Sequence, residues 1–296
     1  EECLIQPESF DAALGVFRSF ARRHNLSAYD SHSHKGFLRH AILRQSKASG
    51  EMVAVLITER GELPDAQELL DGLRRACPGL RGFLWGVNSG LADVARIEEE
   101  RFQWGDLFFH ESLGGVRYRI SAFSFFQTNS LGAKQLYDVI RRFLDGGPTD
   151  SLLDAYCGIG AIGLYCADTV GKVFGIDNVV SSIWDARENA ALNGLNNCTF
   201  FAGDVRERLP LMLNAGTGPI TRVVVDPPRG GMDKKVLRNL LELGAQVFVY
   251  VSCNPSTMAR DVVAISEAGY ELEEIQPVDM FPHTYHIETV IRCVKR

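Results

Sequence analysis

The sequence has no long apolar run, no closely paired cysteines and no excess of basic residues. Because no apolar stretch is long enough to span a bilayer, we expect no membrane association. The net charge of −6 disfavours a broad basic surface for nucleic acid but permits a local basic groove. The chain begins at Glu1 with neither a methionine nor a signal-peptide core, so we expect a fragment or a processed chain.

The cysteines also lack a pattern. Seven of them are scattered along the 296 residues without a CxxC pair, at Cys3, Cys77, Cys157, Cys166, Cys198, Cys253 and Cys293. An odd, unpatterned set is typical of a reducing compartment and disfavours a disulfide framework or a self-contained zinc site, so we expect a cytoplasmic protein. Four histidines match no metal-ligand spacing and are more simply interpreted as solvated or core residues: His24, His32, His34 and His40.

The sequence predicts two regions with different patterns of helices and strands. Periodicity predicts a helix over residues 9–25, strands over 37–45 and 52–58, a helix over 65–76, and strands over 80–87 and within 102–120. This mixture predicts a small α+β unit. Asn129 or Ser130 is expected to cap a helix over residues 131–144. From residue 150 strands and helices alternate, which predicts an open α/β sheet after the smaller unit.

A glycine-rich turn follows the first strand of the alternating region. Gly158 and Gly160 permit a tight turn in which a ligand can approach the backbone. Asp177 ends the next strand, where an acid accepts hydrogen bonds from ribose hydroxyls. Gly158, Gly160 and Gly163 follow the GxGxxG spacing that dinucleotide sites also use. We expect an adenosine-type ligand in preference to NAD, and a dehydrogenase is the weakest alternative.

Two more acids and an amide are candidates for the same ligand, each with a structural alternative. Asp204 follows a strand over residues 199–202, where it either meets an adenine amino group or caps a helix. Asp226 precedes two prolines, which stiffen the loop after the next strand. Gln127 lies among phenylalanines, where it either presents its amide to a ligand or belongs to an aromatic core strand.

Cys253 and Glu288 are the candidates for chemistry. A strand over residues 247–251 leads to Cys253, and a helix over 256–268 follows. A helix N-terminus stabilises negative charge, so this position favours a thiolate; the alternative is a buried, small apolar residue. Glu288 stands before the last strand among apolar neighbours, which predicts a raised pKa suited to a general base. Its alternative is an exposed acid.

Five segments together carry a resemblance to a known family. They are residues 125–129 (FFQTN), 153–160 (LDAYCGIG), 226–229 (DPPR), 252–255 (SCNP) and 286–288 (HIE). In this order they resemble the motifs of the RNA 5-methyluridine methyltransferase family, whose members use S-adenosylmethionine. The resemblance implies a Rossmann-like class I methyltransferase domain over residues 126–296. It also implies a small α+β domain, facing RNA, over residues 1–125.

The resemblance further implies a reaction and a set of site residues. S-adenosylmethionine would be held by Gln127, Tyr156, Gly158, Asp177, Asp204 and Asp226. Cys253 would form a covalent adduct with C6 of a uridine in RNA, and Glu288 would be the general base. We expect a monomer with RNA as its partner.

The N-terminus resembles part of a further site. Ribosomal-RNA members of the family often carry an oligonucleotide-binding TRAM domain and then a four-cysteine iron–sulfur site, and Cys3 resembles the last of those cysteines. A single cysteine cannot hold a cluster, so we expect none in this chain, with Cys3 a remnant of such a site. This likeness favours 23S ribosomal RNA as the substrate, with transfer RNA as the alternative.

Two other classes of protein stay open. An amino-group methyltransferase would carry an aromatic residue where Arg229 stands, and it would need no cysteine nucleophile. A non-catalytic RNA-binding or folding module would keep the cofactor fold without the chemistry. The presence of both Cys253 and Glu288 disfavours this second class.

Overall fold

The computed structural model describes residues 3–296, and its contacts divide the chain into two units. The first unit takes the residues up to 111 together with 121–123, and the second takes 112–120 and 124–296. The chain therefore passes from one unit to the other within the hairpin of β5 (Phe108–Leu113) and β6 (Val116–Ser121). The assignment of functional domains to residues 1–125 and 126–296 stays a prediction.

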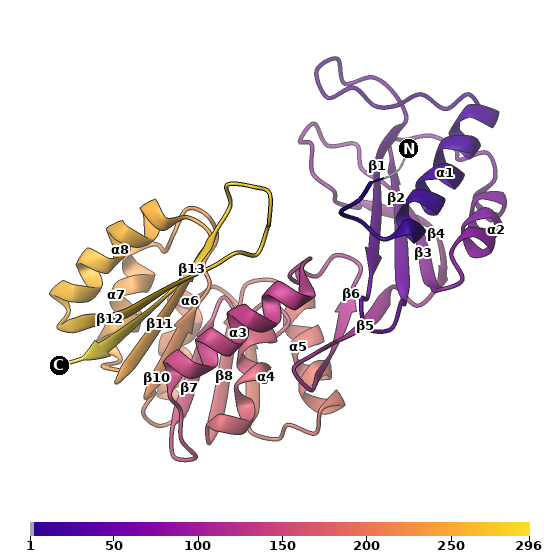
Figure 1. Ribbon diagram of the computed structural model, residues 1–296. Helices are drawn as coiled ribbons and strands as arrows, with labels where there is room; N and C mark the ends of the chain where they lie inside the picture. Colours follow the sequence, from indigo (N-terminus) through magenta and orange to yellow (C-terminus); the bar gives the residue numbers. More distant parts are fainter. Residues whose placement is uncertain (1–2) are drawn as a thin grey trace. The chain divides into compact units, whose positions relative to one another are not determined.

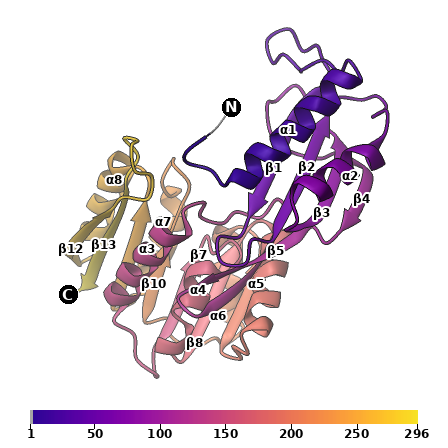
Figure 2. The same cartoon turned by 45° about the vertical axis from the view of Figure 1, so that its right-hand side comes forward.

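A four-stranded sheet with the order β1–β2–β3–β4 forms the first unit. Its elements are α1 (Glu8–Arg23), β1 (Leu38–Gln45), β2 (Met52–Thr58), α2 (Ala66–Ala76), β3 (Leu80–Val87) and β4 (Glu99–Gly105). β1 and β2 form an antiparallel hairpin, whereas β2 and β3 run parallel on either side of α2. Both helices pack against this sheet (Figure 2). Phe20, Leu69 and Leu73 on their apolar faces belong to the buried core of the unit. The predicted small α+β unit is confirmed.

The second unit contains a seven-stranded sheet with the order β12–β13–β11–β10–β7–β8–β9. Its strands are β7 (Ser151–Ala155), β8 (Lys172–Asp177), β9 (Cys198–Ala202), β10 (Arg222–Val225), β11 (Val247–Ser252), β12 (Tyr270–Val278) and β13 (Glu288–Lys295). β7 to β11 run parallel, and β13 pairs antiparallel with both β11 and β12. Strand order reverses between β7 and β10, and this is the switch point at which open α/β sheets bind ligands.

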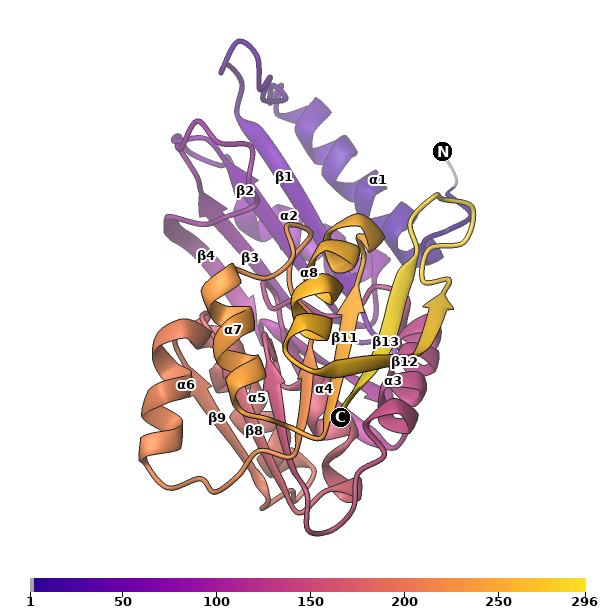
Figure 3. The same ribbon diagram turned by 90° about the vertical axis from the view of Figure 1, so that its left-hand side faces the viewer.

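Helices cover both faces of this sheet. They are α3 (Ser130–Leu144), α4 (Ala161–Tyr165), α5 (Val180–Leu192), α6 (Val205–Asn214), α7 (Lys234–Glu242) and α8 (Pro255–Glu267), with a 3₁₀ turn over Ala167–Thr169. α3, α4 and α5 lie on one face, and α6, α7 and α8 lie on the other (Figures 1 and 3). β10 and β11 are buried along their whole length, as parallel strands covered on both faces must be. The predicted Rossmann-like α/β arrangement is therefore confirmed.

Within residues 3–296, no helix combines the length and the apolar character that a bilayer crossing requires.

Candidate active site

The carboxyl ends of the parallel strands gather most of the predicted site residues at one edge of the seven-stranded sheet. Tyr156 follows β7, Asp177 ends β8, Asp204 follows β9, Asp226 follows β10 and Cys253 follows β11. The ends of parallel strands meet at the same edge, so residues far apart in the sequence become neighbours there. The edge on which the candidates converge is the ligand-binding edge of this fold.

Glu288 joins the same edge from the opposite direction. β13 runs antiparallel to β11, and the last pair of their register is Ser252 with Thr289. The next pair in that register would be Cys253 with Glu288. Burial, followed by the charge of Glu288, raises the pKa of the Cys253 thiol. The nucleophile candidate and the base candidate, 35 positions apart in the sequence, are thus brought together by sheet pairing.

The prediction that the helix N-terminus lowers the pKa of Cys253 is wrong for the free protein. Burial raises the pKa of this thiol above its ordinary value, and the charges of Glu288 and Asp226 raise it further. Arg229 acts in the other direction through its charge and through contact with the sulfur. Burial of the thiol, together with these two carboxylates, therefore outweighs the position of Cys253 before α8.

Glu288 has the environment that a general base requires. Its side chain is buried, and burial raises the pKa of the carboxyl group, whereas the charge of Arg229 lowers it. The carboxylate makes no hydrogen bond within the described part of the chain. The predicted rise in the pKa of Glu288 is confirmed, and a free carboxylate is left to accept a proton.

Asp226 is a second unpartnered acid at the switch point. Burial, followed by the charge of Glu288, raises the pKa of Asp226 to about 7. Across residues 3–296 its carboxylate accepts no hydrogen bond. Such a group is available to hydrogen-bond a ligand, and near neutral pH it populates both its proton-donating and its accepting form.

The glycine-rich turn leaves space beside β7. Gly158 adopts the left-handed conformation with φ +53°, and a Cβ atom built there would meet no heavy atom within 4 Å. The Gly158 N–H donates to the Asp177 carboxylate at 2.9 Å, so the turn and the end of β8 are joined. Asp154, buried beneath the turn, accepts from the Gly163 N–H at 2.8 Å through one oxygen, whereas its other oxygen has no partner in the described residues.

Tyr156 and Asp204 lie together farther along the edge. Burial, followed by the charge of Asp204, raises the pKa of Tyr156 to about 12. Asp204 is also the N-cap of α6, because its carboxylate accepts from the Arg206 N–H at 2.8 Å. The helix-cap interpretation of Asp204 is therefore confirmed, and the remaining lone pairs of the carboxylate stay open to a ligand.

Gln127 lies in the segment that precedes α3. Its side chain is only 8% exposed, and its amide makes no hydrogen bond within residues 3–296. Asn129 holds this segment in place, because its oxygen accepts from the Gly132 N–H at 3.2 Å and its Nδ2 donates to the Met280 carbonyl at 3.0 Å. The predicted Asn129 cap is confirmed. Through Met280 the segment is tied to the loop that leads to Glu288.

The aromatic residues around Gln127 have different environments. Phe126 is buried, with its ring centroid 5.4 Å from that of Tyr118, and is a core residue. Phe125 is 70% exposed. Tyr285 is 91% exposed, and its ring lies 4.2 Å from that of His286. The sequence analysis missed Tyr285, although its place three residues before Glu288, between two histidines of the loop, was a usable signal.

Arg229 is the second residue that the sequence analysis missed. It was used only to distinguish the 226–229 loop from that of amino-group methyltransferases. In the structure its charge acts on both Cys253 and Glu288. An arginine directly after the two prolines of a loop at the switch point was the signal that pointed to it.

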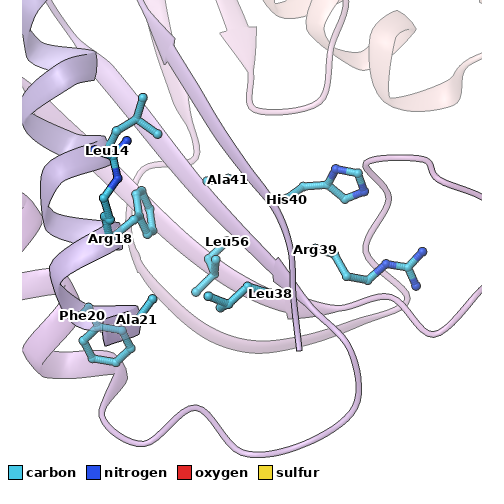
Figure 4. A pocket seen from close by; sticks show the side chains of 10 residues that line it. Leu14, Arg18, Phe20, Ala21, Leu38, Arg39, His40, Ala41 and Leu56 are labelled. Carbon is cyan, nitrogen blue, oxygen red and sulfur yellow. The ribbon is translucent and has the colours of Figure 1, made fainter. Parts of the chain in front are cut away.

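The first unit contains a cavity of about 240 Å³ between α1 and β1 (Figure 4). Leu14 and Leu38 are among the apolar side chains that line it. Arg39 also lines it, and its guanidinium donates to the carbonyl oxygens of Asn88 and Gly90 at 2.7 and 2.8 Å. None of the predicted catalytic or cofactor-binding residues lies here, because all of them belong to the second unit.

The histidines of the first unit have other partners. His24 lies 2.9 Å from Glu68, His34 lies 3.1 Å from Tyr29, His40 lies 3.4 Å from Asp93, and His32 lies 3.9 Å from Asp30. Within residues 3–296, no three His, Cys, Asp or Glu side chains converge as a metal-binding group. The solvated or packing role of these histidines is consistent with their surroundings.

Comparison with known proteins gives a family for the chain. The model of the tRNA (uracil-5-)-methyltransferase family matches residues 94–296. An uncharacterized RNA methyltransferase of Halalkalibacterium halodurans is 38% identical over 290 residues, which are 98% of this chain and 63% of that protein. One of Caldanaerobacter subterraneus is 37% identical over 292 residues, covering 98% of this chain and 64% of that protein. The chain thus spans a little less than two thirds of the curated relatives it matches.

Two solved structures are similar to this chain in fold. The tRNA (uracil-54, C5)-methyltransferase of Pyrococcus abyssi, in complex with S-adenosyl-L-homocysteine, superposes with a TM-score of 0.79 and 32% identity, covering 96% of this chain and 66% of that chain. The M. jannaschii tRNA m1G37 methyltransferase has a TM-score of 0.54 and 14% identity, covering 90% and 78% of the two chains, and indicates the fold alone. The predicted class I methyltransferase fold is confirmed.

Proposed function

The chain belongs to the tRNA (uracil-5-)-methyltransferase family, and on that premise we propose that it transfers a methyl group from S-adenosylmethionine to C5 of a uridine in RNA. The observation that carries the proposal is the register that makes Cys253 and Glu288 neighbours at the ligand-binding edge. Uracil C5 methylation needs a nucleophile and a base at one site, and this pairing supplies both.

The edge fits S-adenosylmethionine at three places. The open space at Gly158 leaves room for a ligand against the backbone, and Asp177 is positioned to accept from ribose hydroxyls. Asp204 and Tyr156 lie farther along the edge, where the adenine would be bound. Asp226, whose charge acts on Cys253, and Gln127 each offer polar groups that no described residue uses. Bound S-adenosylmethionine supplies an electrophilic methyl group on its sulfonium.

Cys253 begins the proposed reaction. Uracil C5 is a weak nucleophile, and a thiolate that bonds to C6 moves the electron pair of the C5–C6 double bond into an enolate. C5 then carries the electron density needed to accept a methyl group. Asp226 and Gln127 are proposed to hold the uracil during this step, because each presents hydrogen-bonding atoms that no described residue uses.

Glu288 completes the proposed reaction. After methylation C5 bears both a hydrogen and a methyl group, and the carboxylate of Glu288 removes the proton. The released electron pair restores the C5–C6 double bond and expels the Cys253 sulfur from C6. The raised pKa of Glu288 makes its carboxylate a stronger base than an exposed glutamate.

The target uridine has to leave its stack to reach Cys253. Enzymes that modify bases work on unstacked or flipped nucleotides, which they hold by stacking on aromatic side chains. Phe125 and Tyr285 are exposed aromatic residues on segments that Asn129 ties together through Met280. We propose these two rings as the stacking surfaces for the target base or its neighbours.

The proposal also includes the class of RNA that is the substrate. The likeness of the Cys3 region to the iron–sulfur members supports 23S ribosomal RNA. The similarity to the Pyrococcus abyssi enzyme, whose name specifies tRNA uracil-54, supports transfer RNA as the second candidate. The protein is incubated with labelled S-adenosylmethionine and unmodified transcripts of each RNA, and the modified nucleoside is identified by mass spectrometry. We expect 5-methyluridine from one transcript, whereas a methylated adenine or cytosine would contradict the proposed chemistry.

A further inference from the structure

Arg229 is held by its backbone against the segment that carries the proposed nucleophile. Its carbonyl oxygen accepts hydrogen bonds from Asn254 Nδ2 at 3.2 Å and from Thr257 Oγ1 at 3.4 Å. Asn254 directly follows Cys253, and Thr257 lies in the first turn of α8. The loop after β10 and the loop after β11 are therefore joined at Arg229.

The rest of the Arg229 loop is also fixed through its backbone. Pro227 and Pro228 restrict the chain before Arg229, and the Gly231 N–H donates to the Pro228 carbonyl at 2.8 Å. Arg260 donates to the Gly230 carbonyl at 3.4 Å. The side chain of Arg229 itself is exposed. Its replacement therefore removes a charge and leaves the contacts that shape the loop intact.

The charges around Cys253 are otherwise negative. Glu288 on β13 and Asp226 after β10 both oppose ionisation of the thiol, and Arg229 favours it. With both carboxylates ionised, a Cys253 thiolate would bring a third negative charge to the same edge. Arg229 forms no ion pair with a carboxylate in the part of the chain that the structure describes, so its charge is available to these groups.

We propose that Arg229 is a positioning residue that stabilises the Cys253 thiolate against the two neighbouring carboxylates. The inference rests on the proposed function, since it assigns Cys253 as the nucleophile. It adds that the fold sets the reactivity of this sulfur by tying the arginine-bearing loop to the nucleophile loop. A cation here would also relieve the repulsion between the thiolate and Glu288, so that nucleophile and base coexist in their charged forms.

The test measures the thiol directly, in the full chain without RNA or S-adenosylmethionine. Alkylation of Cys253 by iodoacetamide is followed from pH 6 to 10 by peptide mass spectrometry, which separates it from the other cysteines. We expect Arg229→Gln to shift the pH profile upward by about half a unit to one unit, so that alkylation at pH 7.5 slows about threefold to tenfold. Arg229→Lys keeps the charge and should stay within about twofold of the unchanged protein.

Arg238→Gln is the matched control, because Arg238 is another exposed arginine of the second unit and pairs with Glu242 at 3.8 Å on α7. It should leave the profile unchanged. An unshifted alkylation profile in Arg229→Gln would overturn the inference. An equal slowing of Cys253 alkylation in Arg229→Gln and Arg229→Lys, together with a lowered unfolding temperature, would also overturn it. The alkylation assay contains no RNA, so its result does not depend on methyl transfer. A failure of methyl transfer in a separate assay would refute the proposed function and leave the alkylation profile unchanged.

Discussion

Cys253 and Glu288 are the residues that directly continue the Ser252–Thr289 pair, where β11 ends and β13 begins. The antiparallel insertion of β13 into an otherwise parallel run makes this possible, because its first residue meets the last residues of β11. A parallel strand in that place would have brought its own last residue to the edge. The proposed nucleophile–base pair is therefore a consequence of topology.

Replacement of the base should separate the two halves of the proposed reaction. Glu288→Gln keeps the shape of the side chain and removes the proton acceptor, so the Cys253 adduct should form and persist. Intact-mass analysis after incubation with RNA and S-adenosylmethionine should show a protein–RNA species, with turnover lowered about 100-fold to 10,000-fold. Glu242→Gln on the surface of α7 is the control, and normal turnover in Glu288→Gln would contradict the assigned role.

The pH dependence of methyl transfer should follow from the two raised pKa values. Glu288 is active as a carboxylate, so activity should fall as the pH falls through its raised pKa. Cys253 is active as a thiolate, whose fraction grows as the pH rises toward its raised pKa. We expect kcat/KM for RNA to increase from pH 6 to pH 9. A profile that is flat over this range would show that neither group limits the rate.

Asp226 should make the protein less stable at alkaline pH. An unfolded aspartate has a pKa of about 3.9, whereas the folded pKa is about 7. Between these values the folded state retains a proton that the unfolded state has lost, so stability falls as the pH rises and the full penalty applies above pH 7. Asp226→Asn should therefore raise the free energy of unfolding at pH 8, by about 2–4 kcal/mol, with little change at pH 4.

Asp233 provides the opposite control for that measurement. The N–H groups of Lys235 and Val236 lower the pKa of Asp233 at the start of α7, so its contribution is present at neutral pH and is lost as the pH falls. Asp233→Asn should not stabilise the protein at pH 8. Urea unfolding, followed by circular dichroism at pH 4 and pH 8, measures the free energy of unfolding of both variants. An equal change in this free energy for Asp226→Asn at the two pH values would contradict the account.

Much of the fold follows from sequence patterns because burial imposes them. The helix of α1, the hairpin of β1 and β2, and the buried strands β10 and β11 were all predicted within a few residues. Strand β12 was not predicted, because its exposed surface carries Glu271, Glu273 and Glu274 in place of an apolar alternation. Helix α6 was also missed, since it contains a proline, Pro210, in its interior.

The identities of the site residues were easier to predict from the sequence than the pKa shifts of those residues. The acids, the amide and the cysteine were recognised from their places after strands and from the family resemblance. The direction of the Cys253 pKa shift was predicted wrongly. The sequence shows α8 following the cysteine but hides the burial of the thiol and the carboxylates of Glu288 and Asp226. Arg229 was missed for the same reason, since its effect depends on pairing across the sheet.

Tyr285 should contribute to RNA binding and not to the cofactor site. Its ring is almost fully exposed beside His286, and stacking of a base on an aromatic ring contributes about 1–3 kcal/mol. Tyr285→Ala should therefore raise the Kd for RNA at least about fivefold, with unchanged affinity for S-adenosylmethionine by calorimetry. Ile275→Ala, at another exposed apolar residue, is the control. Unaltered RNA affinity in Tyr285→Ala would remove this ring from the proposed binding surface.

The central claim is that Cys253 attacks C6 of a uracil before C5 is methylated. The most direct measurement is intact-mass analysis of the protein incubated with S-adenosylmethionine and RNA that contains 5-fluorouridine, because fluorine at C5 cannot be removed as a proton. The account predicts a stable covalent species with one methylated RNA attached, absent in Cys253→Ala and present in Cys198→Ala. An absence of adduct in the unchanged protein, with binding of RNA and S-adenosylmethionine both measured, would contradict it.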